Sequence, residues 1–492
     1  MEKLAKEHYL DLENGMFAET TAADLDDLLA ALSGHPDRDN LVIHFHGGLV
    51  SREAAHPIAE RVFDTYRAGE AYPVFVIWNS GLLQTLRNNL SEIGKEEAFK
   101  RLVRRVAQFA LGKLVETVGD RGQPLELTSM KNMPRNLDSL EAFLDEREST
   151  LAPAEDLALS KEQEDQIDNE FKKDLVLRRE ATLIANGLRK PDEVDEDLKT
   201  RGGSPVRGST QTLMSASILK EIAEQTPDPS ERSSQMVLAL VTYGLKILKA
   251  VLQRYSTGRD HGLYTTIVEE VLRTLYLDNA GALVWKLIKN DTLHAFGGDL
   301  TKHGGTALAQ GLAGSWHDGQ RITLVGHSTG AIYIGEFLEE ADKVLPAEAR
   351  FDVVYLAAAC SFKYLQERLE LFERRVSNIR VFGLSDEIER SYWEVPVIYR
   401  GSLLYLVSGL FEEEEIDMPL VGMERYFGAE GPYDRPDIVD VLDYIKPEMR
   451  VWSGKAEGLG PGKRCTAATH GAFDDEDQPT RDSVAHLLRE GF

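Results

Sequence analysis

The chain has 492 residues, of which 42% are hydrophobic, and its 82 acidic and 56 basic side chains give a formal net charge of -26. This length is too great for a small single core, so we expect one large domain with an insertion, or two domains. The acidic surplus argues against a nucleic-acid partner, and two cysteines, Cys360 and Cys465, cannot supply a disulfide framework or a cysteine-rich metal site.

Signals for secretion or membrane insertion are weak in this sequence. The first residues lack the basic-then-apolar order of a signal peptide. The longest apolar run, 236–252, contains Lys246 and Lys249 and falls short of the roughly 20 apolar residues of a spanning helix. We therefore expect a soluble, cytoplasmic protein.

Residues 40–78 predict a strand–helix–strand unit. Residues 1–40 predict a helical lead-in, and the apolar run after it, 40–49, predicts a buried strand that ends in His46-Gly47-Gly48. Glycines at the end of a strand leave backbone N–H groups open to a substrate, although a simple tight turn would have the same composition. A helix over 51–68 and an apolar strand over 72–78 complete a pattern typical of parallel sheets.

A long helix-rich segment then interrupts the core. Amphipathic patterns predict helices over 95–115, 236–254, 263–277 and 306–313. We interpret 79–297 as a helical cap inserted into a core made of 1–78 and 298–492. The helix over 95–115 alternates basic and apolar residues, which gives the hypothesis of peripheral membrane contact through the cap. The simpler interpretation is a solvated cap helix.

The clearest motif is Gly326-His327-Ser328-Thr329-Gly330, which follows an apolar run and precedes a helical pattern. A serine held in a strained turn needs small residues two positions to either side. The helix behind it directs its first N–H groups toward negative charge that develops at the serine. The motif therefore predicts a nucleophile elbow, with an ordinary glycine-rich turn as the alternative.

The remaining core is predicted from alternating strands and helices. Strands are expected over 351–359 and 378–384 with a helix over 362–375 between them, and 401–411 predicts a buried helix. The segment 463–468 is expected to lead from the last strand into the loop of His470, before a final helix over 480–488.

A serine hydroxyl needs a neighbouring base, and the base needs an orienting carboxylate. Ser328, Asp386 and His470 occur in the order nucleophile, acid, base, and the last two follow predicted strands, where open α/β sheets place their sites. Glu387 is an alternative acid. The other histidines considered are interpreted as structural or ordinary residues: His44, His46, His327 and His486.

These residues resemble the α/β-hydrolase superfamily, in its serine esterase and lipase-like branch. The likeness covers about 40–80 and 320–492 and rests on the His-Gly-Gly loop, the Gly-x-Ser-x-Gly turn, Asp386 and His470-Gly471. It implies an α/β-hydrolase fold, with a parallel-dominated sheet and helices on both faces. It also implies that backbone amides of Gly48 or Leu49 and of Thr329 form the oxyanion hole. The insertion departs from the family, whose lids often follow the sixth strand.

The function expected from this resemblance is hydrolysis of small-molecule or lipid carboxylic esters through an acyl-serine, without a cofactor or metal. Two alternatives remain open. A peptidase or amidase could use the same triad, and a scaffold without catalysis could bind a protein or membrane partner through the cap.

Overall fold

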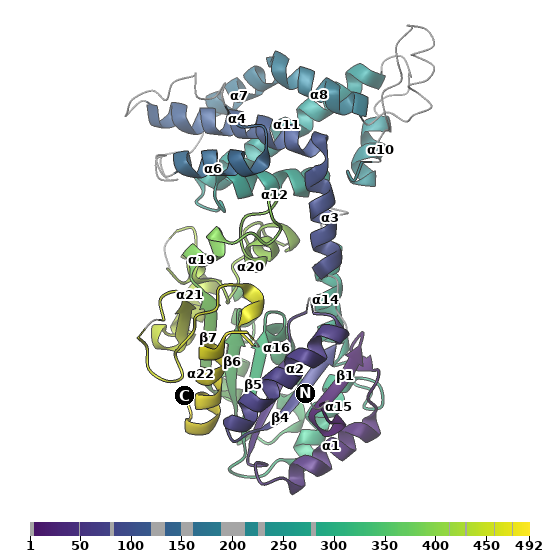
Figure 1. Ribbon diagram of the computed structural model, residues 1–492, viewed down its shortest axis with the longest axis vertical. Helices are drawn as coiled ribbons and strands as arrows, with labels where there is room; N and C mark the ends of the chain where they lie inside the picture. The colour runs from purple at the N-terminus through teal and green to yellow at the C-terminus, as the bar shows by residue number, and fades with distance from the viewer. Residues whose placement is uncertain are drawn as a thin grey trace. The chain divides into compact units, whose positions relative to one another are not determined.

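The computed structural model describes residues 4–48, 50–78, 83–119, 133–148, 161–187, 212–224, 232–276, 282–412, 414–428, 431–456, 458–474 and 476–492 (Figure 1). The chain forms two compact units. The sheet unit consists of Met1–Gln84, Leu283–Tyr392 and Gly401–Phe492, and the helical unit consists of Thr85–Ala282 and Trp393–Arg400.

The sheet unit is built on an eight-stranded sheet in the order β2-β1-β4-β3-β5-β6-β7-β8. Every neighbouring pair is parallel except β1 and β2, which confirms the predicted α/β class with a mostly parallel sheet. The strands are β1 (Tyr9–Glu13), β2 (Met16–Phe17), β3 (Asn40–Phe45), β4 (Tyr72–Trp78), β5 (Arg321–His327), β6 (Phe351–Leu356), β7 (Val376–Leu384) and β8 (Arg450–Ser453).

Helices cover this sheet in two groups. The chain passes from β3 to β4 through α2 and from β5 to β6 through α16, in opposite directions along the sheet. Because such crossovers are right-handed, α2 and α16 lie on opposite faces. In agreement, α2 packs on β4 and α22, in front of the sheet in Figure 1, whereas α16 packs on β3, β5, α15 and α18. The helices are α1 (Ala22–Gly34), α2 (Arg52–Ala68), α14 (Ala282–His294), α15 (Gly304–Ser315), α16 (Gly330–Val344), α17 (Phe362–Gln366), α18 (Leu369–Arg375), α19 (Asp386–Ser391), α20 (Leu403–Leu406), α21 (Pro436–Tyr444) and α22 (Gln478–Glu490).

The predicted helical lead-in is wrong at its beginning, where β1 forms and pairs with β4. Asp11 lies in the middle of β1 and breaks its apolar pattern. Its carboxylate is fully buried, and Arg52 Nη2 lies 2.9 Å from Asp11 Oδ1. Arg52 of α2 compensates the buried charge of Asp11. The sequence of the strand alone does not reveal this partner.

The segment 463–468 is not a strand; the last strand is β8, and 463–468 is irregular. Its polar groups are bound by side chains instead of a neighbouring strand. The N–H group and hydroxyl of Thr466 donate to the Asp477 carboxylate, and the Ser453 hydroxyl donates to the Ala467 carbonyl. This loop leads to the 3₁₀ helix His470–Ala472, labelled η6. The apolar run 401–411 is buried and helical, as predicted.

The helical unit contains α3 from Thr85 onward and seven further described helices. They are α3 (Leu83–Lys95), α4 (Glu97–Gly119), α6 (Leu137–Glu148), α7 (Lys161–Lys173), α8 (Leu175–Gly187), α10 (Ala216–Glu224), α11 (Arg232–Ser256) and α12 (Leu263–Leu275). Within α11, Ser234–Ser256 is long and apolar enough to cross a membrane, with a mean hydropathy of 1.5 over its most apolar 18 residues. Half of this 18-residue stretch is buried inside the protein.

The two units do not follow the predicted boundaries everywhere. The cap was predicted to extend to residue 297, yet most of α14 belongs to the sheet unit. Conversely, Trp393–Arg400 belongs to the helical unit although it was predicted as core. This segment is held there by Tyr264, which donates to the Val397 carbonyl at 3.0 Å, and by Tyr399, which donates to Glu269 at 2.6 Å.

Candidate functional site

Ser328 occupies a sharp turn between β5 and α16. Its φ angle is 55°, a left-handed conformation that costs a residue other than glycine about 1–3 kcal/mol. Two hydrogen bonds hold the turn: the Ser328 N–H donates to the Leu356 carbonyl, and the Ala359 N–H donates to the Ser328 carbonyl, both at 2.9 Å. The strained serine is therefore fixed by the chain at the end of β6.

The glycines on either side of Ser328 are required by close approach of the backbone. A Cβ atom on Gly326 would lie 2.8 Å from the Gly330 carbonyl group. A Cβ atom on Gly330 would lie 2.2 Å from the Phe45 carbonyl oxygen. The turn thus packs directly on β3, and its glycines permit that packing.

Gly330→Ala is expected to lower the free energy of unfolding by about 1–3 kcal/mol, because the new methyl group must displace backbone rather than a flexible side chain. Urea unfolding of the purified protein measures this change. Gly314→Ala is the matched control, since nothing lies within 4 Å of its Cβ position and alanine favours a helix by up to about 1 kcal/mol. A Gly330→Ala variant as stable as the wild type would contradict the close approach.

The loop after β3 lies against the serine turn. A Cβ atom on Gly48 would be 2.2 Å from Thr329 Oγ1 and 2.5 Å from Ile288 Cγ2, and one on Gly47 would be 3.5 Å from Ser328 Cβ. The structure therefore brings together Gly48 and Thr329, two of the three residues predicted to supply oxyanion donors. The third, Leu49, lies outside the described residues.

His46 shapes this loop, as the sequence interpretation held, and the structure shows that it does so in its neutral form. The Trp78 N–H donates to His46 Nε2 at 3.0 Å, so Nδ1 carries the proton and donates to the Gly47 carbonyl at 2.7 Å. The ring also stacks on Trp78, with centroids 4.0 Å apart. Burial lowers the pKa of His46 to about 4.

This burial predicts acid sensitivity. The unfolded chain takes up a proton near pH 6.5, whereas folded His46 resists protonation until about pH 4, so stability is lost as the pH falls through that interval. The loss due to His46 should reach about 3 kcal/mol at pH 4. Urea unfolding at a series of pH values tests this. His46→Asn should flatten the slope, and His317→Asn, at a side chain that is 39% exposed, should leave it unchanged. Equal slopes in all three proteins would contradict the expectation.

A buried ion pair lies beneath the loop of His470. His327 Nε2 donates to the His470 carbonyl at 2.9 Å, and His327 Nδ1 lies 3.1 Å from Asp474 Oδ2. Because both ring nitrogens face acceptors, His327 is doubly protonated and pairs with an Asp474 carboxylate. Burial alone would raise the pKa of Asp474, but the charge and hydrogen bond of His327, with a further contribution from His44, lower it below its usual value.

Sequence reasoning missed Asp474 and gave His327 no role at the site. The structure places His327 directly behind Ser328 and uses it to hold the segment that carries His470. The only available signal was that Asp474 follows His470 by one helical turn in the same loop.

The three residues of the predicted triad lie at the ends of different elements. Ser328 and His470 are both buried, and the His470 ring centroid lies 5.2 Å from that of His327, the neighbour of Ser328. Asp386 begins α19, just past β7, and its carboxylate accepts a hydrogen bond from Tyr405 at 2.5 Å. Within the described part of the chain, Asp386 therefore binds Tyr405 rather than His470. The alternative acid, Glu387, is exposed.

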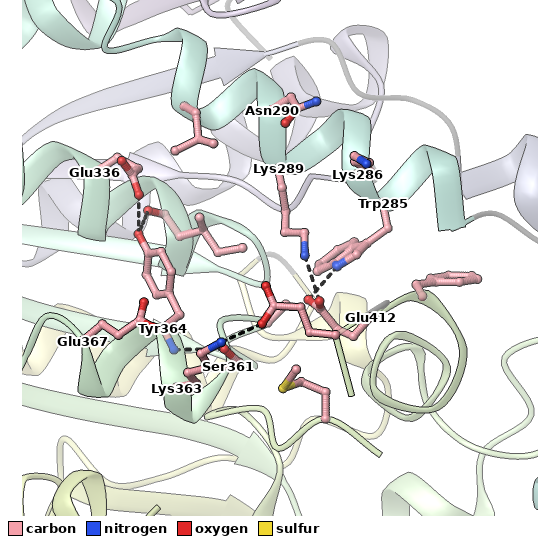
Figure 2. Close-up of a pocket in the computed structure, with 16 residues that line it drawn as sticks. Trp285, Lys286, Lys289, Asn290, Glu336, Ser361, Lys363, Tyr364, Glu367 and Glu412 are labelled. Carbon is pink, nitrogen blue, oxygen red and sulfur yellow. Dashed lines mark hydrogen bonds and ion pairs between the residues drawn. The ribbon is translucent and has the colours of Figure 1, made fainter. Parts of the chain in front are cut away.

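A pocket of about 430 Å³ lies beside α16 (Figure 2). Ile332 and Glu336, one and two turns beyond Ser328, contribute to its wall, together with Ala359. Its lining includes neither Ser328 nor His470. An occupant would therefore contact the helix behind the serine rather than the serine itself.

Two lysines of this pocket pair with glutamates of its own wall. Glu412 accepts from the Trp285 indole and from Lys289, both at 2.8 Å, and Lys363 pairs with Glu414 at 2.9 Å (Figure 2). These groups satisfy one another without a ligand. We assign the pocket no role in the chemistry.

One group of side chains has the composition of a metal site. Ligand atoms of Asp11, Glu19 and His56 lie within 4.8 Å of one another. Arg52, however, already places a guanidinium 2.9 Å from Asp11. The buried carboxylate thus has its own cation, and we propose no metal there.

The arrangement as a whole places a strained serine hydroxyl at the end of a central strand, with two backbone segments and a histidine-bearing loop around it. Such a set can stabilise negative charge and move a proton. A search of family models, of curated proteins and of solved structures finds no match to this chain.

Proposed function

We propose that this chain is a serine hydrolase that cleaves carboxylic esters and that its sheet unit has the α/β-hydrolase fold. The proposal rests first on Ser328, a residue other than glycine held at a φ of 55° between glycines whose Cβ positions are occupied. The order of the site residues supports it too, because Ser328 follows the central β5, Asp386 follows β7 and His470 follows β8.

In the proposed reaction, Ser328 Oγ attacks the ester carbonyl carbon while His470 takes the hydroxyl proton. The oxyanion binds to the N–H groups of Gly48 and Thr329. His470 then gives the proton to the departing alcohol, and water repeats the sequence to release the acid. Asp386 orients His470 after its carboxylate exchanges Tyr405 for the imidazole, since catalytic hydrogen bonds often form only when substrate is bound.

The test is covalent labelling of the purified chain with a fluorophosphonate, which reacts with activated serines. The wild type should be labelled and Ser328→Ala should not, with the exposed Ser33→Ala as the control that retains labelling. Ser328→Gly should also lose labelling but gain about 1 kcal/mol in unfolding free energy, because glycine relieves the left-handed strain. Labelling that persists in Ser328→Ala would contradict the assignment.

Substrate class is tested with nitrophenyl esters and the matching nitroanilide amides. We expect turnover of the esters that disappears in Ser328→Ala. Amide turnover exceeding ester turnover would transfer the proposal to peptidase or amidase chemistry on the same serine.

A further inference from the structure

The corner between α7 and α8 exposes aliphatic side chains. Leu175 is 81% exposed and Val176 is 52% exposed at the first turn of α8. Leu183, 44% exposed, follows at helical spacing and so extends the same face. Three exposed aliphatic residues on one helix face indicate a surface that contacts something apolar. We call Leu175, Val176 and Leu183 the aliphatic face.

Basic residues bracket the aliphatic face. Four side chains at the corner are basic and exposed: Lys172, Lys173, Arg178 and Arg179. This local run of positive charge stands out in a chain whose formal net charge is -26. It indicates a partner with negative charge beside its apolar part.

The acidic residues nearest the corner are paired with cations of other helices, whereas the exposed acids Glu162, Glu164 and Asp165 lie toward the far end of α7. Glu180 pairs with Arg101 of α4 at 2.6 Å, and Asp174 pairs with Arg105 of the same helix. Cations of α4, the helix that the sequence suggested for membrane contact, are thus engaged by α7 and α8.

Two acids of α7 approach the corner. Asp168 lies 3.5 Å from Lys172 but only 2.6 Å from Lys249 of α11, and the exposed Glu170 pairs with Lys113 of α4 at 2.8 Å. Cations of α4 and α11 therefore pair with the acids closest to the corner. The outward side of the corner keeps its positive charge.

The corner is also held rigidly. Asp174 caps α8 by accepting from the Leu177 N–H at 2.5 Å, and Arg178 Nε donates to the Lys172 carbonyl at 2.9 Å. Phe171 and Leu177 on either side are buried. Because these residues anchor the turn, Leu175 and Val176 cannot fold back into the core.

We propose that the α7–α8 corner docks on an anionic lipid bilayer, with Leu175 and Val176 entering the interface and the surrounding cations binding lipid headgroups. Branched aliphatic side chains ringed by Lys and Arg fit a membrane surface, which offers apolar chains and negative charge together. This inference is independent of the proposed hydrolase chemistry, since none of its residues belongs to the site around Ser328.

The experiment is flotation of the full chain with phosphatidylcholine vesicles that contain or lack phosphatidylserine. The wild type should float with the anionic vesicles alone and should be released by high salt. Leu175→Asn with Val176→Asn should weaken binding at least about tenfold, because both apolar side chains are lost. Lys173→Gln with Arg179→Gln should weaken it roughly fivefold for each charge removed.

Leu300→Asn with Val439→Asn is the matched control, because these side chains are 45% and 37% exposed in the sheet unit. It should bind as the wild type does, and unchanged thermal unfolding should show that every variant is folded. Wild type that floats with neither vesicle, or equally with both, would overturn the proposal. So would a lipid-free dimer that Leu175→Asn with Val176→Asn dissociates, since the occupant would then be a second copy of this chain.

Discussion

His470→Ala is expected to slow acylation of Ser328 by a factor of about 10⁴ to 10⁶, the usual effect of removing the base of a serine triad. Without the imidazole, the serine proton has no acceptor while the carbon–oxygen bond forms. The backbone carbonyl that binds His327 remains in an alanine variant, so the loop should keep its position. The measurements are kcat/KM for a nitrophenyl ester and the rate of fluorophosphonate labelling.

The control is His486→Ala on α22, which should react at the wild-type rate. A His470→Ala variant with nearly normal labelling would remove His470 from the proposed mechanism while leaving Ser328 in it.

The acid is tested separately by Asp386→Asn and Glu387→Gln. If Asp386 orients the base, its variant should lose about 10⁴-fold in kcat and the Glu387 variant should lose nothing. The reverse result would assign the role to Glu387.

The central strands could be predicted because they are buried on both faces. The run 72–78 is continuously apolar and 322–325 is apolar except for Thr323, which is typical of parallel strands between helix layers. The serine turn was equally accessible, because its requirements are local: small residues two positions from Ser328 and a helix directly after it. Where sequence alone determines the geometry, sequence reasoning succeeded.

The failures share a different cause. β1 contains Asp11, and its burial is compensated by Arg52, about forty residues later and on another element. Residues 463–468 are irregular because Asp477 binds their polar groups. The position of Trp393–Arg400 depends on helices far earlier in the chain. In each case a partner outside the segment decides its structure, and the hydrophobic pattern of the segment does not reveal that partner.

The same reasoning applies to Asp474, whose partners His327 and His44 come from other strands. Asp474→Asn is expected to lower the free energy of unfolding by about 3–5 kcal/mol, because it leaves the buried His327 cation without its counter-charge. Asparagine preserves the size of the side chain, so the loss would report charge rather than packing. Urea unfolding at neutral pH measures the change. Asp482→Asn, at an exposed position of α22, should cost almost nothing.

The pH dependence of this difference separates the ion pair from other effects. Because folding lowers the pKa of Asp474, the carboxylate adds stability above its ordinary pKa of about 3.9, and that stability is lost as the pH falls below it. The gap between wild type and Asp474→Asn should therefore narrow as the pH falls below about 4. A gap that stays constant into acid would show that the carboxylate charge is not what stabilises the loop.

If the ion pair of His327 and Asp474 also positions His470, the Asp474→Asn variant should label more slowly with fluorophosphonate even where it is fully folded. Normal labelling would confine Asp474 to stability.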